Sequence, residues 1–222
     1  MKSLEKYAKK MASDWDRVLV RRVMWIDMEE RIRRIFRDVE GSPYANEFGA
    51  LFILNGIHED AKEFYITQRL NQIQIGCGTR FLGLNAIDIE DEKPKKKVRF
   101  EKGAALWFSQ SPTGGVTVFM SPYSSDVVTM TEDNIIIGMY KEPSRLTERE
   151  IYKIFSKFFK YLSITSALHP HTSLDYVWRL WLIYFDARSK RFGTLFNSLD
   201  RVIIFGGAFV TVCAFIIQAL KS

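Results

Sequence analysis

The sequence predicts an α+β fold in which a central antiparallel sheet or small barrel is flanked by helices, with one C-terminal transmembrane helix. The middle of the chain alternates short apolar runs with turn residues, whereas the stretches on both sides show helical spacing. Near the end of the chain, 19 consecutive residues carry no charge. These patterns predict a long N-terminal helix at 1–41, a β-rich core at 42–146, amphipathic and aromatic helices at 147–194, and a membrane anchor at 195–222.

The composition is that of a folded domain whose two ends are basic. Of the 222 residues, 47% are hydrophobic and 14% aromatic, which is enough to form a core and excludes global disorder. Two cysteines are too few for a disulfide scaffold. The net charge of +6 comes from both ends of the chain, while the middle is mildly acidic. Because the positive charge is not gathered in one domain, nucleic-acid binding is not expected.

Residues 3–38 show the spacing of a long helix. Its first half carries one apolar stripe, which consists of Leu4, Tyr7, Ala8, Met11, Trp15, Val18 and Leu19. Beyond Val18 the apolar residues spread round the helix, so we expect it to be covered on two sides or joined by another chain. This predicts a partner surface that includes Val18, Trp25 and Ile26. The Gly-Ser-Pro run at 41–43 ends the helix.

Residues 48–140 are predicted to be mostly β-structure. The candidate strands are Phe48–Leu54, Glu63–Gln68, Asn71–Cys77, Phe81–Ile87, Lys97–Phe100, Ala104–Gln110, Gly115–Ser121 and Asn134–Tyr140. The clearest hairpin joins the sixth and seventh of these through a Ser-Pro-Thr-Gly turn at 111–114. The charged stretch Asp88–Lys97 is predicted to be an exposed loop.

Two further helices are expected after the β-rich core. Residues 147–168 have one apolar stripe, and Thr147 with Glu150 gives the Thr-x-x-Glu pattern of a helix start. The aromatic stretch Asp175–Asp186 is too short to span a bilayer. It suits either a core helix packed on the sheet, which we favour, or a helix at the membrane interface.

The run Val202–Leu220 is the strongest signal in the sequence. As a helix it would be about 28 Å long, close to the thickness of the bilayer core. The alternative is a buried core helix, but a core helix of this length normally has one solvent-exposed face that carries charged residues. The anchor prediction rests on Val202, Ile203, Phe205, Gly206, Gly207, Thr211, Ala214, Phe215 and Leu220. The small residues among them suit close helix packing and hence self-association.

A basic flank precedes the anchor and predicts its orientation. Arg188, Lys190, Arg191 and Arg201 lie before the run, and only Lys221 and Ser222 follow it. Basic flanks stay in the cytoplasm. No apolar segment follows the basic N-terminal residues, so no signal peptide is predicted. We therefore expect a tail-anchored protein of the inner (cytoplasmic) membrane, with most of the chain in the cytoplasm.

The sequence shows no motif for catalysis, for a metal or for a cofactor. Nucleotide-binding glycine loops, a nucleophile elbow and zinc-protease spacing are all missing. Of the three histidines, His58, His169 and His171, the last two flank a proline and no cysteine or acidic cluster joins them. Cys77 lies where a strand is predicted to end. We expect no cofactor, and the balance leans away from an enzyme without excluding one.

Three functions remain compatible with these patterns. The leading hypothesis is a cytosolic sensing domain that oligomerises and perturbs or signals through the membrane, as bacterial effectors and antiviral defence proteins do. This is a likeness of layout alone. The alternative is a membrane-tethered accessory or scaffold subunit of a complex, and the third is a membrane-bound enzyme with an unrecognised site. The expected partners are membrane lipid and either further copies of the chain or a protein complex.

Overall fold

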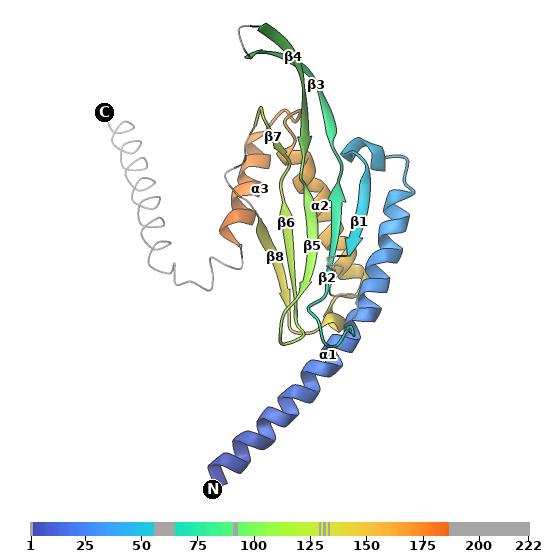
Figure 1. Ribbon diagram of the computed structural model, residues 1–222, viewed down its shortest axis with the longest axis vertical. Helices are drawn as coiled ribbons and strands as arrows, with labels where there is room; N and C mark the ends of the chain where they lie inside the picture. The colour runs from blue at the N-terminus through green and yellow to red at the C-terminus, as the bar shows by residue number, and fades with distance from the viewer. Residues whose placement is uncertain are drawn as a thin grey trace, which may run out of the picture.

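The computed structural model describes residues 2–55, 65–90, 93–128, 130, 132 and 134–186. The body is an α+β fold built on a five-stranded antiparallel sheet of order β1-β2-β5-β6-β8, and a second sheet has the order β3-β4-β7 (Figure 1). The strands of the large sheet are β1 (Leu51–Asn55), β2 (Gln72–Cys77), β5 (Ala105–Gln110), β6 (Val116–Ser121) and β8 (Ile135–Tyr140). The α+β prediction is therefore confirmed, with two antiparallel sheets.

The predicted hairpin at 104–121 is present as β5 and β6, which pair from Ala105↔Ser121 to Gln110↔Val116. The Ser111 amide donates to the Gly115 carbonyl at 2.8 Å and so closes the turn. Gly114 has a φ of 78°, a conformation that glycine adopts without steric cost. The local turn chemistry explains why this element could be predicted.

The large sheet has one buried face and one half-exposed face. Ile75, Leu106 and Met120 lie side by side in register, and all three are fully buried. Their neighbours Trp107 and Phe119 point to the other face and are only partly covered. The buried face therefore carries the core, as in other antiparallel sheets with one covered side.

The buried face is covered by α2 (Glu148–Thr165) and by the second half of α1 (Lys2–Glu40), with α3 (Ser173–Tyr184) beside α2. Short 3₁₀ turns, η1 (Ala45–Phe48) and η3 (Pro143–Arg145), connect them to the sheet. The predicted start of α2 is confirmed, because the Thr147 side chain accepts from the Glu150 amide. The apolar stripe of α2 is buried as expected, with Ile151, Phe155, Phe158 and Leu162 in the core.

The two halves of α1 have different surroundings. The second half is packed into the core through Trp25, Met28 and Ile32, each of which is fully buried. The first half runs clear of the body (Figure 1), and the side chains of residues 3–17 are all exposed. The second half of α1 is thus a core element, and its first half is a solvent-exposed helical extension.

The predicted partner surface on this helix falls in three environments. Trp25 is 0% exposed and belongs to the chain's own core, so it can't face another molecule in this fold. Ile26, one residue on, is 50% exposed, and Val18 is half-buried where the helix leaves the body. The apolar character of Trp25 is explained by its packing, because the sheet and α2 both lie on its side of the helix.

Two local predictions in the β-rich region are wrong. The stretch Asp88–Lys97, expected to be a loop, belongs to a hairpin of β3 (Arg80–Glu90) and β4 (Lys93–Lys102) that stays paired out to Glu90↔Lys93. The register sets acidic positions of β3 opposite lysine positions of β4, a pattern that favours strand pairing and that a search for apolar alternation overlooks. In the candidate strand Glu63–Gln68, the described residues form a turn, with the Gln68 amide 2.8 Å from the Tyr65 carbonyl.

No helix in the described part of the chain is long and apolar enough to cross a membrane. The predicted anchor Val202–Leu220 and its basic flank of Arg188, Lys190, Arg191 and Arg201 lie outside the described residues. The transmembrane part of the predicted fold therefore stays a prediction.

The contrast between Trp25 and Ile26 gives a test of how α1 packs. Trp25→Ala should lower the free energy of unfolding by about 3–5 kcal/mol, because it leaves a cavity in the core. Ile26→Ala, at an exposed helix position, should change it by less than about 0.5 kcal/mol. Chemical denaturation followed by circular dichroism would measure both. Equal losses would show that Trp25 is not a core residue.

A candidate interaction site on the β3–β4 arm

The described residues offer no obvious chemistry. They contain no group of three or more His, Cys, Asp or Glu side chains that could hold a metal ion. Cys77 is 4% exposed, and burial raises the pKa of its thiol to about 12, although a hydrogen bond with Tyr123 opposes this. A thiol with so high a pKa is a poor nucleophile, because the thiolate is the reactive form.

His169 and His171 help to form the start of α3. His169 Nε2 lies 3.0 Å from Asp175 Oδ2, and the two histidine rings meet edge to face at 5.5 Å. Asp175 also accepts from the Thr172 hydroxyl at 2.5 Å and completes a capping box with it. The hydrogen bonds from Thr172, then from His169, lower the pKa of Asp175 to about 2. His169 therefore supports the cap of α3, His171 packs against His169, and His58 lies outside the described residues.

The most distinctive surface is the hairpin of β3 and β4, which we call the arm. It extends beyond the end of the large sheet (Figure 1) and exposes a set of large apolar side chains. These are Phe81, Leu84, Ile87, Val98 and Phe100, of which Ile87 is the most exposed at 67%. A register shift between Phe81 and Asn85 contains Gly83, whose φ is 69°, so the strand bends at a residue without a Cβ.

One face of the arm combines aromatic, aliphatic and basic side chains. Phe81 and Phe100 are paired across the strands, and their rings lie 5.7 Å apart. Lys96 and Val98 precede Phe100 at alternate positions of β4 and therefore point to the same face as Phe100. An open groove at the base of the arm is lined by Thr79, Lys97, Val98, Phe100, Lys102, Ser124, Ser125 and Asp126. An apolar surface bordered by lysines fits a partner that is itself apolar with acidic edges.

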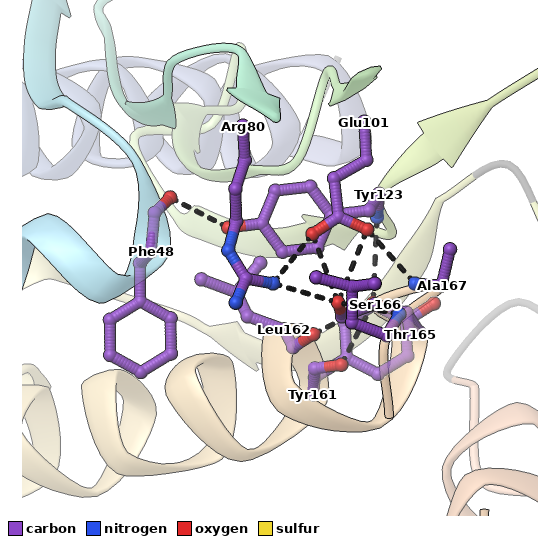
Figure 2. A network of polar contacts seen from close by, with 10 residues as sticks. Phe48, Arg80, Glu101, Tyr123, Tyr161, Leu162, Thr165, Ser166 and Ala167 are labelled. Atoms are coloured by element: carbon purple, nitrogen blue, oxygen red, sulfur yellow. Dashed lines mark hydrogen bonds and ion pairs between the residues drawn. The ribbon is translucent and has the colours of Figure 1, made fainter. Parts of the chain in front are cut away.

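A buried carboxylate attaches the arm to the body. Glu101, at the base of β4, is 0% exposed and lies opposite Arg80 in the register. It accepts from Arg80 Nη1 at 2.8 Å, from the Ser166 hydroxyl at 2.9 Å and from the Ala167 amide at 2.9 Å (Figure 2). Ser166 and Ala167 directly follow α2. The ion pair thus joins both strands of the arm to the end of a core helix.

Tyr123 extends this polar network to the other side of the fold. Its hydroxyl donates to the Phe48 carbonyl at 2.7 Å, and its amide lies 3.4 Å from the Thr165 hydroxyl (Figure 2). Burial raises the pKa of Tyr123, and the nearby Cys77 and Glu101 act in the same direction. Tyr123 stays a neutral hydrogen-bond donor between η1 and the end of α2. The network is therefore a structural joint.

A second buried carboxylate attaches α3. Glu132 accepts two hydrogen bonds from Arg179, at 2.7 and 2.5 Å, and one from the Tyr161 hydroxyl at 3.0 Å. Lys160 Nζ adds a contact 4.5 Å from the centre of the Trp178 ring. Glu132, which precedes β8 in the chain, is thereby joined to both α2 and α3.

The aromatic stretch that forms α3 has two faces. Leu182 is buried in the core, as the favoured prediction of a core helix requires. Tyr176, Trp181 and Tyr184 are each more than half exposed, as the alternative of an interfacial helix requires. The helix thus packs on the body with one side and presents aromatic rings to the surroundings with the other.

The structure brings together residues that sequence reasoning missed. Glu101, Arg80 and Ser166 come from three separate elements, and so do Glu132 and Arg179 with α2. No local motif marks them, because each pair is far apart along the chain. The predicted surface at Val18 and Ile26 lies on α1 and forms no part of the arm.

Comparisons with protein-family models, with curated proteins and with solved structures found no significant match for this chain.

The buried ion pair can be tested with matched carboxylate variants. Glu101→Gln should lower the free energy of unfolding by about 3 kcal/mol, because Arg80 then loses its buried counter-charge. Glu5→Gln, at an exposed pair with Lys9, should cost less than about 1 kcal/mol. Urea denaturation would compare the two. A loss for Glu101→Gln as small as that for Glu5→Gln would contradict the role of the joint.

The attachment of α3 should weaken in acid. The folded state lowers the pKa of Glu132, where the Arg179 and Tyr161 hydrogen bonds outweigh the desolvation that opposes them, and it lowers the pKa of Asp175 to about 2. Both carboxylates therefore stabilise the fold at pH values above their ordinary pKa values of 4.5 and 3.8. This stabilisation is lost as the pH falls through the lower pKa values that the two groups have in the folded state.

The midpoint temperature of thermal unfolding should therefore decrease as the pH is lowered from 5 to 2. Glu132→Gln should begin with a lower midpoint at pH 7 and lose less of it on acidification, since one of the carboxylates whose pKa the fold lowers is gone. A variant whose midpoint falls as steeply as that of the parent chain would rule out Glu132 as a source of the pH dependence.

Proposed function

We propose that this chain is a tail-anchored membrane protein whose folded body binds a partner or ligand in the cytoplasm and acts by oligomerising. Its output would be a signal or a perturbation at the membrane, of the bacterial effector or antiviral defence type. The single observation that carries the proposal is the amount of apolar surface that the folded body leaves open. Exposed apolar patches of this kind mark binding sites for proteins or membranes.

The open apolar surface lies on three separate elements, each attached to a rigid core. The arm exposes Ile87 and its apolar neighbours, the first half of α1 exposes a stripe, and α3 exposes Tyr176, Trp181 and Tyr184. Buried carboxylates hold two of these elements in place. Rigid attachment supports a binding function, because a partner then meets a surface that is already ordered.

The membrane part of the proposal is supported by the order of features after α2. The exposed aromatic rings of α3 come first, the basic residues at 188–191 follow, and the uncharged run Val202–Leu220 comes next. Aromatic rings suit the headgroup level and basic residues suit the anionic cytoplasmic leaflet. A helix across the bilayer in this order would place α3 close to the membrane surface.

A second candidate is a membrane-tethered scaffold or accessory subunit. The arm favours it, because its aromatic and lysine-bordered face suits one dedicated partner. Stoichiometric co-purification of another protein, lost in an Ile87→Glu variant, would favour this function over self-assembly. For the third candidate, an enzyme, the described residues offer no cluster that could hold a metal ion.

Membrane fractionation tests the anchor directly. The full chain should sediment with membranes and need detergent, and a chain truncated after Arg201 should be released. Within the full chain, Thr211→Arg should reduce membrane retention, because a charge at the centre of a span costs about 2.5–3.5 kcal/mol. Thr211→Leu should leave retention unchanged.

The mass of the full chain in detergent then separates an oligomer from a monomeric tether. If the full chain and the truncated chain are both soluble without detergent, Val202–Leu220 is a buried helix and the membrane proposal fails.

A further inference from the structure

The side of α3 that faces away from the body is apolar along the whole helix. Its large exposed side chains, each between 46% and 81% exposed, are Leu174, Tyr176, Val177, Leu180, Trp181 and Tyr184. Ser173 is the only other exposed residue of this helix. We call this set of seven residues the outer side of α3, and it contains no charged residue.

Both charged residues of α3 are turned towards the body instead. Arg179 pairs with Glu132, and these two side chains are only 19% and 7% exposed. Asp175 contacts His169 and completes the helix cap, with its own side chain 22% exposed. A surface helix in water normally has its charged residues on the outside. Because burying charges costs free energy, the reverse arrangement fits a helix whose outer side does not face water.

The helix packed beside α3 has an ordinary water-facing side. The charged residues that α2 exposes are Glu148, Arg149, Lys153, Lys157 and Lys160. Its apolar stripe is buried in the core. The uncharged outer side therefore distinguishes α3 from its neighbour in the same fold.

We propose that the outer side of α3 is embedded in the surface of a lipid bilayer, with the helix lying in the plane of the membrane. The 12 residues of α3 make a helix of about 18 Å, which is too short to cross the hydrocarbon core. A helix of this kind inserts its apolar side about 5–10 Å into the boundary between headgroups and acyl chains. The inference deepens the membrane part of the proposed function and rests on it.

The residue types on the outer side of α3 favour lipid over a protein partner. Three of the six large side chains, Tyr176, Trp181 and Tyr184, are of the two types that concentrate at the headgroup level of membranes. A protein interface surrounds its apolar centre with a polar rim that forms hydrogen bonds. The outer side of α3 carries no charge, and Ser173 is its only polar residue without an aromatic ring.

Lysines next to α3 fit the charge of a membrane surface. Lys160 Nζ lies 4.5 Å from the centre of the Trp178 ring, so this lysine of α2 is beside α3. Lys157 is exposed on α2 one turn before it. Basic residues that flank an embedded helix are attracted to the anionic lipids of the cytoplasmic leaflet.

The order of the sequence places α3 next to the predicted anchor. It is the last helix of the described chain, and residues 187–201 separate it from the uncharged run Val202–Leu220. This connecting stretch contains four basic residues and one acidic residue. The membrane that the run is predicted to enter is therefore the one that α3 would meet.

Fluorescence of the full chain in lipid vesicles tests the proposal. The dye NBD, whose emission depends on its surroundings, is attached through Val177→Cys or, as a control on the charged side of α2, through Ser156→Cys. Both are made in a Cys213→Ala background, and Cys77 is buried. In vesicles of phosphatidylcholine and phosphatidylglycerol, the label at position 177 should emit at shorter wavelength than the label at position 156. Lipid with a nitroxide near the headgroup should quench it several-fold more strongly.

Water-like emission from both labels would overturn the proposal. A shorter emission wavelength at position 177 without quenching by the nitroxide lipid would also overturn it, because a protein surface or a second copy would then cover α3. Alkaline extraction of the same vesicles reports on the anchor alone. If the chain proves soluble without detergent, the anchor has failed, and the labelled chain is mixed with preformed vesicles, where the quenching still decides about α3.

A charge on the outer side of α3 gives a second test. In a chain whose anchor is weakened by Thr211→Arg, Val177→Asp should lower binding to the same vesicles several-fold in a flotation assay, and Leu174→Asp should act alike. Ser156→Asp should leave binding unchanged. All three positions are exposed, so circular dichroism should show an intact fold in each variant. Equal binding by the α3 variants and Ser156→Asp would contradict the insertion of α3.

Discussion

The arrangement of this fold depends on a carboxylate that has no access to water. Glu101 is fully buried, and an ionised group in such a place is tolerated only if donors surround it. Arg80, the Ser166 hydroxyl and the Ala167 amide are those donors. Because these donors come from different elements, the base of the arm, the sheet and the end of α2 must keep fixed positions relative to one another. A joint of this kind contributes a fixed geometry more than it contributes net stability.

A fixed geometry suits the surfaces that surround it. The arm, the first half of α1 and the outer side of α3 all expose apolar side chains. The arm and the first half of α1 are attached to the core at one end, and α3 is attached along its inner side. Burial of Trp25 fixes where α1 leaves the body, and the pair of Glu132 with Arg179 fixes α3. The core therefore presents several contact surfaces at set positions, and the described residues contain no cluster suited to metal-dependent chemistry. The proposed binding function rests on this arrangement of exposed surfaces.

The elements that could be predicted from the sequence are those whose signals are local. The hairpin at 104–121 follows from its turn, and the start of α2 follows from Thr147 and Glu150. The outer part of the arm was missed because its register sets acidic positions of β3 opposite lysine positions of β4, in place of the apolar alternation on which strand prediction relies. The joint at Glu101 was missed for a different reason. Its partners lie 21 and 65 positions away, and no single-sequence pattern links residues at such distances.

The separation between Glu101 and Ser166 also orders events during synthesis. Glu101 leaves the ribosome 65 residues before Ser166 does, so until α2 has been made its carboxylate can pair with Arg80 of the same hairpin but not with Ser166. Closing so long a loop is slow compared with forming the hairpin itself. The arm therefore forms early as a pair of strands and locks onto the body late.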